Sequence, residues 1–346
     1  MERIPPAEIR TITITPDEHE QITRLIEPGR SDPVTETEAY ILEAQMLSAR
    51  LPDPVRRELL NFRIDGSRLG GLLVRNVPLG SIPPTPAHAD DGVGIRLDAA
   101  RSMSIMLAVI GEQFGFRPEL GGRIIQDILP VPGFEDTQQS ISSRAPLELH
   151  CETVFTDSRS DFVALLCLRP DHQRVAATLF SPAVKVLAEL DKATINVLKQ
   201  PRFSTTVDGS FLRGSGLEHA VVVQPITIVS GSEECPRLRC DFAETRGLDP
   251  RAQEAVEALY ATACRTATGV YLEAGDLVII DNHSTFHGRT SFPMKRDGND
   301  RWLLRSFVAR DLSRSIQNRP GAKRIIDIDY AAISAQVPEL SSRVDG

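Results

Sequence analysis

Cysteine is scarce in this sequence of 346 residues, and its five thiols form no recognisable pattern. Their number is odd and no CxxC pair occurs, so the sequence predicts neither a disulfide framework nor a zinc knuckle. We expect small buried thiols in a reducing compartment. The five residues are Cys151, Cys167, Cys235, Cys240 and Cys264.

Long apolar runs and an excess of positive charge are also missing. No apolar stretch approaches the ~18 residues that a bilayer span requires, and residues 1–6 lack the apolar segment of a secretory signal. Lys and Arg total 39 against 47 Asp and Glu, giving a net charge of −8. This balance argues against binding to duplex nucleic acid, which draws on clustered cations. The sequence therefore predicts a cytoplasmic protein without membrane or nucleic-acid partners.

Several catalytic signatures are absent as well. There is no GxSxG nucleophile motif, no Walker A loop and no GxGxxG fingerprint. The composition of 41% apolar and 25% charged residues is nevertheless that of an ordinary folded globule with a substantial core. Chemistry that depends on a protein nucleophile or a bound nucleotide is therefore not indicated.

Hydrophobic periodicity divides the chain into a mainly helical first third and a strand-rich remainder. We expect helices at 35–50, 54–62, 99–114, 183–199 and 250–264. We expect strands at 70–77, 124–131, 161–168, 221–228, 270–280 and 302–309. Strands without regular βα alternation favour a mainly β fold with flanking helices over a doubly wound sheet. Without a convincing linker, we expect a single domain spanning 1–346, with a helical part at 1–120, a core at 121–312 and a C-terminal extension at 313–346.

The first chemically distinctive stretch is Glu148-Leu149-His150-Cys151-Glu152. On an extended strand, His150 and Glu152 project from the same face and can form two adjacent corners of a metal shell. A His-x-Glu tripeptide alone is weak evidence, because it arises often by chance. Glu148 shares this face and is either a carboxylate that orients the imidazole or a plain strand residue.

The second stretch, 275–289, runs from an apolar strand into a polar turn with two histidines, His283 and His287. Either could complete a two-histidine, one-carboxylate facial triad, which is typical of non-haem Fe(II) oxygenases. Farther along, Arg301 and Arg305 share one face of a strand and could each hold a carboxylate. Trp302 points to the opposite face, so we expect it in the core.

Four segments in a fixed order resemble the Fe(II)/2-oxoglutarate-dependent oxygenases of the clavaminate synthase-like family, especially the asparagine, arginine and lysine hydroxylases of antibiotic pathways. The resemblance extends from about Leu72 to Leu312. Its segments are His150-Cys151-Glu152, Arg174-Val175-Ala176-Ala177-Thr178, Asp281-Asn282 leading to His287-Gly288-Arg289, and Asp300-Arg301-Trp302-Leu303-Leu304-Arg305. Gly288-Arg289 and the fourteen-residue step to Arg301 favour His287 over His283 as the third ligand.

The resemblance implies a role for each matching residue. His150, Glu152 and His287 would bind Fe(II), leaving positions for 2-oxoglutarate and O2. Arg301 and Thr178 would bind the distal carboxylate of 2-oxoglutarate. The implied substrate set is Arg305 for the α-carboxylate, Asp241 of Leu238-Arg239-Cys240-Asp241 for the side chain, Ser140 by a looser match, and Glu152. Arg289 is either structural or a substrate anchor.

The family also implies a double-stranded β-helix, or jelly roll, with the metal between its sheets. The expected reaction is hydroxylation of an sp3 carbon, Cβ or Cγ, of a free L-amino acid, with release of succinate and CO2. Asp241 favours a basic substrate, lysine or arginine. Asparagine, glutamine or an amino acid tethered to a carrier protein remain alternatives, as do another cupin-type metal enzyme and a non-catalytic binding protein. Segments 78–92 and 204–219 are candidate lids.

Overall fold

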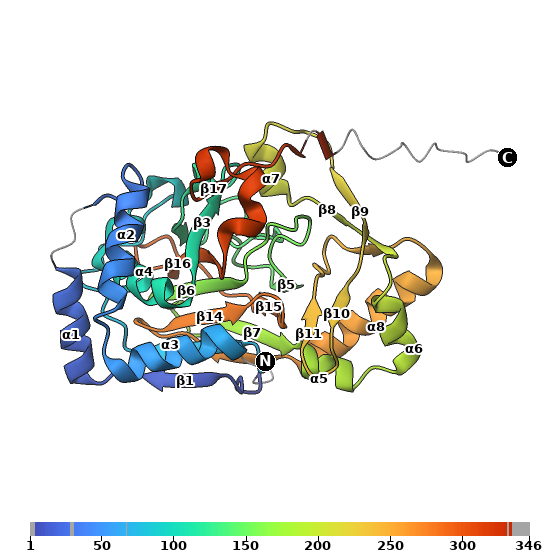
Figure 1. The fold of residues 1–346 in the computed structure, drawn as a ribbon, viewed down its shortest axis with the longest axis horizontal. Coiled ribbons are helices and arrows are strands. Elements are labelled where there is room, and N and C mark those ends of the chain that lie inside the picture. The colour runs from blue at the N-terminus through green and yellow to red at the C-terminus, as the bar shows by residue number, and fades with distance from the viewer. Residues whose placement is uncertain (1–3, 28–30, 67, 331, 334–346) are drawn as a thin grey trace.

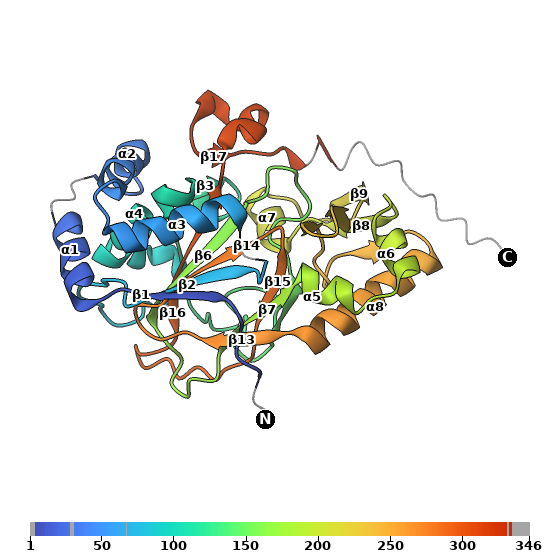
Figure 2. The same cartoon turned by 60° about the horizontal axis from the view of Figure 1, so that its bottom comes forward.

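Two β-sheets form the centre of the molecule and helices cover their outer faces (Figures 1 and 2). The computed structural model describes residues 4–27, 31–66, 68–330, 332 and 333. The larger sheet has the order β1-β2-β14-β6-β16-β3-β17, and β4 also pairs with β16. Its strands are β1 Arg10–Thr13, β2 Gly71–Arg75, β3 Glu112–Phe116, β4 Gln126–Ile128, β6 Phe162–Arg169, β14 Leu277–Asp281, β16 Trp302–Ala309 and β17 Ile325–Ile326.

The smaller central sheet has four strands in the order β13-β7-β15-β5. Apolar residues of both sheets, including Val163, Phe180 and Leu303, join in one buried cluster, so the two sheets face one another. Its strands are β5 Leu147–His150, β7 Ala177–Pro182, β13 Thr268–Tyr271 and β15 Thr285–Arg289. The predicted mainly β fold with flanking helices is confirmed at this level.

The first four helices pack on the outer face of the larger sheet. Their buried side chains form one cluster with alternate residues of its strands, such as Leu72, Ala164 and Leu304. The first helix begins with a capping box between Thr15 and Glu18, a common N-terminal signal. The four are α1 Pro16–Ile26, α2 Thr37–Ser48, α3 Asp53–Asp65 and α4 Asp98–Ile110.

A third buried cluster covers the outer face of the smaller sheet. It joins strand residues such as Leu149 and Phe286 to helices α5 Ala183–Ala188, α6 Lys192–Leu198 and α8 Pro250–Thr266. The remaining elements are α7 Gly209–Gly214, β8 Phe203–Thr206, β9 Val222–Ile226, β10 Val229–Gly231, β11 Pro236–Leu238 and β12 Arg246–Gly247. Short 3-10 helices occur at Ala89–Asp91, Gly94–Arg96, Leu120–Gly122, Leu312–Asn318 and Pro320–Ala322.

Strand β16 shows how the sequence pattern positions the site. Trp302 and Leu304 pack against the helical layer, whereas Leu303 and Phe307 face the smaller sheet. Because side chains alternate along a strand, Arg301 and Arg305 also face the space between the sheets. The predicted position of Trp302 in the core is confirmed, and its indole N–H donates to Asp127 Oδ1 at 2.8 Å.

Three predicted elements were wrong in extent. The helix expected at 99–114 ends at Ile110, because Gly111 follows and β3 begins at Glu112. The helix expected at 183–199 is two helices, α5 and α6, and Asp191 caps the second. The strand expected at 270–280 is β13 and β14, which belong to different sheets. Gly275, with φ +87°, lies between them in a conformation that favours glycine.

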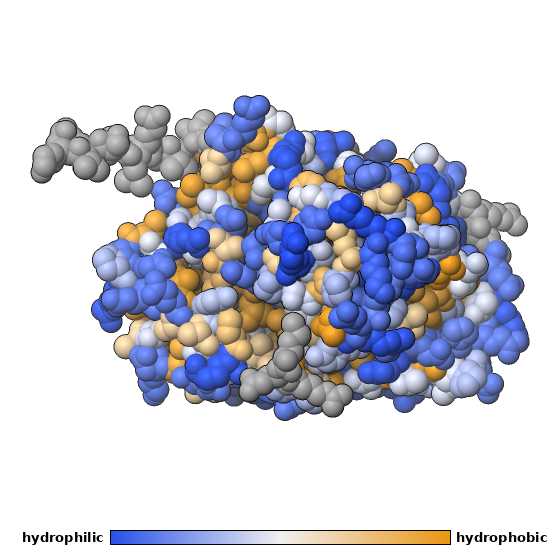
Figure 3. All heavy atoms as spheres, turned by 180° about the vertical axis from the view of Figure 1, so that it is seen from behind, coloured by the Kyte–Doolittle hydropathy of each residue, from blue (hydrophilic) through white to orange (hydrophobic). Residues whose placement is uncertain are grey.

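The N-terminal third is less helical than predicted, since β1 and β3 join the predicted strand β2 in the larger sheet. The predicted extension at 313–346 lies partly outside the described residues. Polar side chains dominate much of the surface seen from behind, with apolar ones in scattered patches (Figure 3). Over the described part of the chain, no helix has the length and apolar character needed to cross a membrane.

Candidate active site

The strand register of the smaller sheet brings two of the predicted metal ligands together. His150 on β5 is paired directly with His287 on β15 in an antiparallel ladder. Directly opposite residues of such a pair project from the same face. The centroids of the two imidazole rings are 4.4 Å apart.

Glu152 completes the group. Its Oε1 lies 3.9 Å from Nε2 of His150 and 3.8 Å from Nε2 of His287. One ligand atom from each of these three residues lies within 4.8 Å of the other two. Two imidazole nitrogens and one carboxylate oxygen, buried in the protein and open to a cleft on one side, fit a non-haem Fe(II) centre.

The ring of His150 is oriented by the backbone. Its Nδ1 lies 2.8 Å from the carbonyl oxygen of Glu148, so a proton on Nδ1 donates there and Nε2 is left for a metal. Of the two interpretations of Glu148, the orienting carboxylate is therefore wrong, because the main-chain oxygen holds the ring.

The charges of the three side chains are strongly coupled. Burial disfavours the charged form of His150, but the Glu152 carboxylate opposes this effect and raises the pKa of His150 to about 9. Burial, followed by the neighbouring His150, lowers the pKa of His287 to about 4. Burial alone would raise the pKa of Glu152, yet Arg305 and the two histidines hold it well below its usual value. The carboxylate is therefore ionised and suited to a cation.

His283 lies in a separate polar network. Its Nε2 is 2.9 Å from Oδ1 of Asp161, and the same carboxylate accepts a hydrogen bond from the backbone N–H of Arg310 and pairs with Arg314. Burial lowers the pKa of His283 to about 4 despite this carboxylate. The structure thus places His287, and not His283, beside His150 and Glu152.

A small inner cavity beside His287 contains the residues expected to bind 2-oxoglutarate. It has a volume of about 50 Å³ and includes Arg301 and Thr178. Arg301 is buried, lies over the ring of Phe292, and forms no salt bridge with any residue that the structure describes. Burial lowers its pKa. Since Thr178 Oγ1 is also buried without a hydrogen-bond partner, the cavity presents a cation and a hydroxyl that suit a carboxylate.

Arg289 borders the same cavity, but its guanidinium is already hydrogen-bonded to other groups of the protein. Its guanidinium donates to Ser142 Oγ at 2.9 Å and to the Ala145 carbonyl at 3.1 Å. Burial, together with the charge of Arg301, lowers its pKa to about 9. These contacts support the structural interpretation of Arg289, as an anchor for the loop before β5.

An outer cleft of about 500 Å³ opens from Glu152. Arg305 reaches it from β16, where it donates to Gln126 Oε1 at 2.9 Å, lies 3.4 Å from Glu152 Oε1, and pairs with Glu119. Glu119 and Gln126 were not recognised in the sequence. They lie nearly two hundred residues before Arg305 in no recognisable motif. The pairing of β4 with β16 places Gln126 opposite Arg305, and Glu119 accepts a hydrogen bond from Gln126 Nε2.

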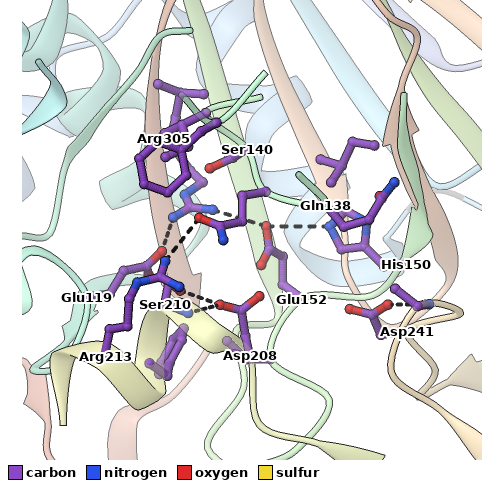
Figure 4. A pocket seen from close by; sticks show the side chains of 18 of the residues that line it. Glu119, Gln138, Ser140, His150, Glu152, Asp208, Ser210, Arg213, Asp241 and Arg305 are labelled. Atoms are coloured by element: carbon purple, nitrogen blue, oxygen red, sulfur yellow. Dashed lines mark hydrogen bonds and ion pairs between the residues drawn. The ribbon is translucent and has the colours of Figure 1, made fainter. Parts of the chain in front are cut away.

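Acidic residues line the far wall of this cleft (Figure 4). Asp241 forms an antiparallel bridge with His150, and burial raises its pKa. Asp208 at the start of α7 and Glu244 also line the cleft, and sequence analysis missed both. Within the described chain, none of these three carboxylates forms a salt bridge. Ser140 borders both the outer cleft and the inner cavity.

Both candidate lid segments reach the cleft. His88 and Asp90 come from segment 78–92, and Phe211 and Arg213 of α7 come from segment 204–219. Arg213 donates to Gln139 Oε1 at 3.1 Å, which links α7 to the loop before β5. Whether these segments close over a substrate stays a prediction.

Two histidines and one carboxylate that could hold a metal ion, close to two buried arginines, are typical of the centre of a metal-dependent oxygenase. The chain belongs to the family described as taurine catabolism dioxygenase TauD, TfdA family, whose model matches residues 33–307.

Named relatives are similar over most of their length. An L-asparagine oxygenase of Streptomyces coelicolor is 38% identical over 272 residues, covering 78% of this chain and 80% of the relative. An L-lysine 3-hydroxylase of Catenulispora acidiphila is 33% identical over 298 residues, covering 84% and 82%. A crystal structure of asparagine oxygenase with Fe(II), 2S,3S-3-hydroxyasparagine and succinate has a TM-score of 0.85 and 31% identity, covering 92% of this chain and 99% of that one.

Proposed function

We propose that this protein is an Fe(II)- and 2-oxoglutarate-dependent dioxygenase that hydroxylates Cβ or Cγ of a free basic L-amino acid. The observation that carries the proposal is the placement of His150, Glu152 and His287 between two arginines on one face of β16. Arg301 lines the inner cavity and Arg305 lines the outer cleft. Two carboxylate-bearing molecules can therefore meet at one metal centre.

The inner cavity suits the cosubstrate. Bound Fe(II) with 2-oxoglutarate and O2 supplies the oxidising chemistry, and the protein orients the reacting molecules. Arg301 and Thr178 would hold the distal carboxylate of 2-oxoglutarate through a charge-assisted hydrogen bond in a site shielded from water. Arg301 forms no salt bridge with a residue that the structure describes, so no ion pair of this arginine would have to break first.

The outer cleft suits the charged groups of an α-amino acid. Arg305 would bind the α-carboxylate, and Glu119 beside it offers an acceptor for the α-ammonium group. Gln126 fixes the Arg305 guanidinium by accepting from its Nε. Ser140 and Glu152 border the same space. The reacting carbons would then lie toward the metal, with the side chain directed to the acidic wall.

The acidic wall supports a cationic side chain. Asp208 and Asp241 point toward the same space from opposite sides in Figure 4. Both carboxylates are partly buried and form no salt bridge with a described residue, so a lysine ammonium or an arginine guanidinium would stabilise this wall. The asparagine oxygenase relative supports an amide side chain as the alternative, because an amide N–H could also donate to Asp241. An amino acid tethered to a carrier protein is a further alternative.

We propose, in addition, that the two facing sheets form a double-stranded β-helix and that the chain functions as one oxygenase unit. The β5-β15-β7 arrangement, the facing larger sheet and the ligand positions between them support this architecture.

The direct test is a screen of the twenty amino acids with Fe(II), 2-oxoglutarate and ascorbate under air, read by mass spectrometry and by succinate formation. We expect a gain of one oxygen atom for lysine or arginine, with one succinate per hydroxylation. Hydroxylation of asparagine or glutamine alone would favour the amide alternative. Turnover without succinate would overturn the assignment in favour of another cupin-type enzyme.

A further inference from the structure

The three metal ligands are held in two different ways. His150 and His287 lie on paired strands, so the ladder fixes their spacing. Glu152 lies two residues beyond the end of β5, in a turn rather than a strand. The next residue, Thr153, has φ +52°, a left-handed conformation that a β-branched side chain rarely adopts. A contact outside the sheet must therefore hold the Glu152 backbone in place.

The side chain of Asn282 makes this contact. The backbone N–H of Glu152 donates to Asn282 Oδ1 at 2.7 Å, and Asn282 Nδ2 donates to the Glu152 carbonyl at 3.2 Å. Nδ2 also donates to the carbonyl of Ser160 at 3.0 Å. The side chain is fully buried. Because both polar backbone groups of Glu152 are bound by one amide, this peptide segment cannot rotate without breaking buried hydrogen bonds.

Asn282 also lies close to the third ligand along the chain. It occupies the turn between β14 and β15, five residues before His287, and its own N–H donates to the carbonyl of Asp161 at 3.0 Å. Asp281 closes the same turn by accepting from the N–H groups of His283 and Ser284. The turn that holds Asn282 thus connects β15, which carries His287, to the backbone of Glu152.

We propose that Asn282 is a positioning residue for the metal centre. It fixes the Glu152 carboxylate relative to the two imidazoles, and so determines how tightly the site binds Fe(II). The inference rests on the proposed function, in which these three side chains bind iron. Groups that orient metal ligands commonly change metal affinity by roughly 10- to 100-fold when they are removed.

The test compares Asn282→Ala with the wild type and with a matched control, Asn318→Ala. Asn318 donates to Ser158 Oγ, so the control also removes one asparagine hydrogen bond, away from Glu152. Metal-free protein is titrated with Fe(II) and 2-oxoglutarate without O2, and the charge-transfer absorption band is followed. Urea unfolding of the metal-free proteins is measured in parallel. We expect Fe(II) affinity to fall roughly 10- to 100-fold in N282A and to stay within about twofold in N318A.

The possible results distinguish a failure of the role of Asn282 from a failure of the proposed function on which that role rests. A wild type that gives no band and binds no iron would overturn the proposed function. A wild type that binds iron, with N282A binding equally well, would overturn the role of Asn282, even where urea unfolding shows N282A to be less stable. If N282A does not fold, Asn282→Ser keeps a buried polar group too short to bond both sides of Glu152. Its iron affinity should be about tenfold weaker, and unchanged affinity would contradict the proposal.

Discussion

The two ends of the cleft are built differently. At the metal end, His150 and His287 are neighbours in a β-ladder, Arg305 lies on β16, and Arg301 directly precedes that strand. At the far end, Asp208 precedes a six-residue helix, and Asp241 and Glu244 follow a three-residue strand. Strand register therefore fixes the two histidines and Arg305, while short connecting segments carry the acidic residues of the cleft. Substrate preference can change there without disturbing the sheets.

The largest expected effect separates the two histidines of the metal end. Changing His287 to Ala should remove a ligand and lower turnover by a factor of about a thousand or more, with loss of bound iron. The matched change His283→Ala should retain iron and turnover but destabilise the fold, because it leaves Asp161 without its imidazole partner. Iron content and initial rates check both variants. Loss of iron in H283A and its retention in H287A would reverse the assignment.

A second prediction tests whether the inner cavity is a separate carboxylate site. Arg301→Ala should raise the KM for 2-oxoglutarate roughly 30-fold or more, with a much smaller effect on the KM for the amino acid. Arg301→Lys retains the charge but loses the planar pair of donors, so its effect should be intermediate. Steady-state kinetics with each substrate varied in turn provide the measurement. Equal changes in both KM values would argue against two distinct sites.

A third prediction concerns the acidic wall. Asp241→Asn and Asp208→Asn should each lower kcat/KM for lysine or arginine by about tenfold relative to asparagine, since each removes one charge that faces the substrate side chain. Asparagine is as good a helix cap as aspartate, so α7 should stay intact in D208N. Asp191→Asn, which changes the equivalent cap of α6 outside the cleft, is the control and should leave the ratio unchanged. An unaltered ratio in D241N and D208N would contradict the basic-substrate proposal.

The smallest expected effect on activity belongs to Asp127, a buried strand residue whose replacement should change stability instead. Burial raises the pKa of Asp127 to about 6, although the Trp302 indole N–H opposes the shift. The folded state therefore holds the proton more tightly, and this group's contribution to stability declines as the pH rises from about 4 to about 6. Asp127→Asn should remove this decline, worth at most about 3 kcal/mol, without altering substrate preference.

Urea unfolding of wild type and D127N at pH 4.5 and pH 7.5 measures this effect. The difference in unfolding free energy should favour D127N more strongly at the higher pH. A pH-independent difference between the two proteins would show that the carboxyl group does not titrate differently on folding.

Sequence patterns could predict the parts of the site that depend on local geometry. The period of two in a strand places Arg301 with Arg305 and sends Trp302 to the opposite face. The extended strand expected through Glu152 was wrong, because β5 ends at His150 and Glu152 lies in the turn that follows. The resemblance to a known family then indicated that these segments, although distant in the sequence, form one site. The contacts that the sequence did not reveal depend on pairing between segments that are distant in the chain. Nothing near Gln126 indicates that β4 will pair with β16 at Arg305, and nothing near Glu119 indicates its ion pair with the same arginine.

The bounds of the helices and strands were likewise predictable only where the local pattern is clear. Helices with clear periodicity, such as α2 and α8, were predicted close to their observed bounds, and β16 was predicted at both ends. The run at 270–280 was predicted as one strand because it is apolar at both ends, but Glu273, Gly275 and Asp276 interrupt it where the chain turns from one sheet to the other. The short helix α7 and its cap Asp208 have too few residues to show a period.

The most direct test of the account is anomalous X-ray diffraction at the iron edge from crystals grown with Fe(II) and 2-oxoglutarate in the absence of O2. We expect one strong peak per chain, within bonding distance of Nε2 of His150, Nε2 of His287 and a carboxylate oxygen of Glu152, with the cosubstrate extending toward Arg301. A peak that lies elsewhere, or a cosubstrate bound away from Arg301, would contradict it.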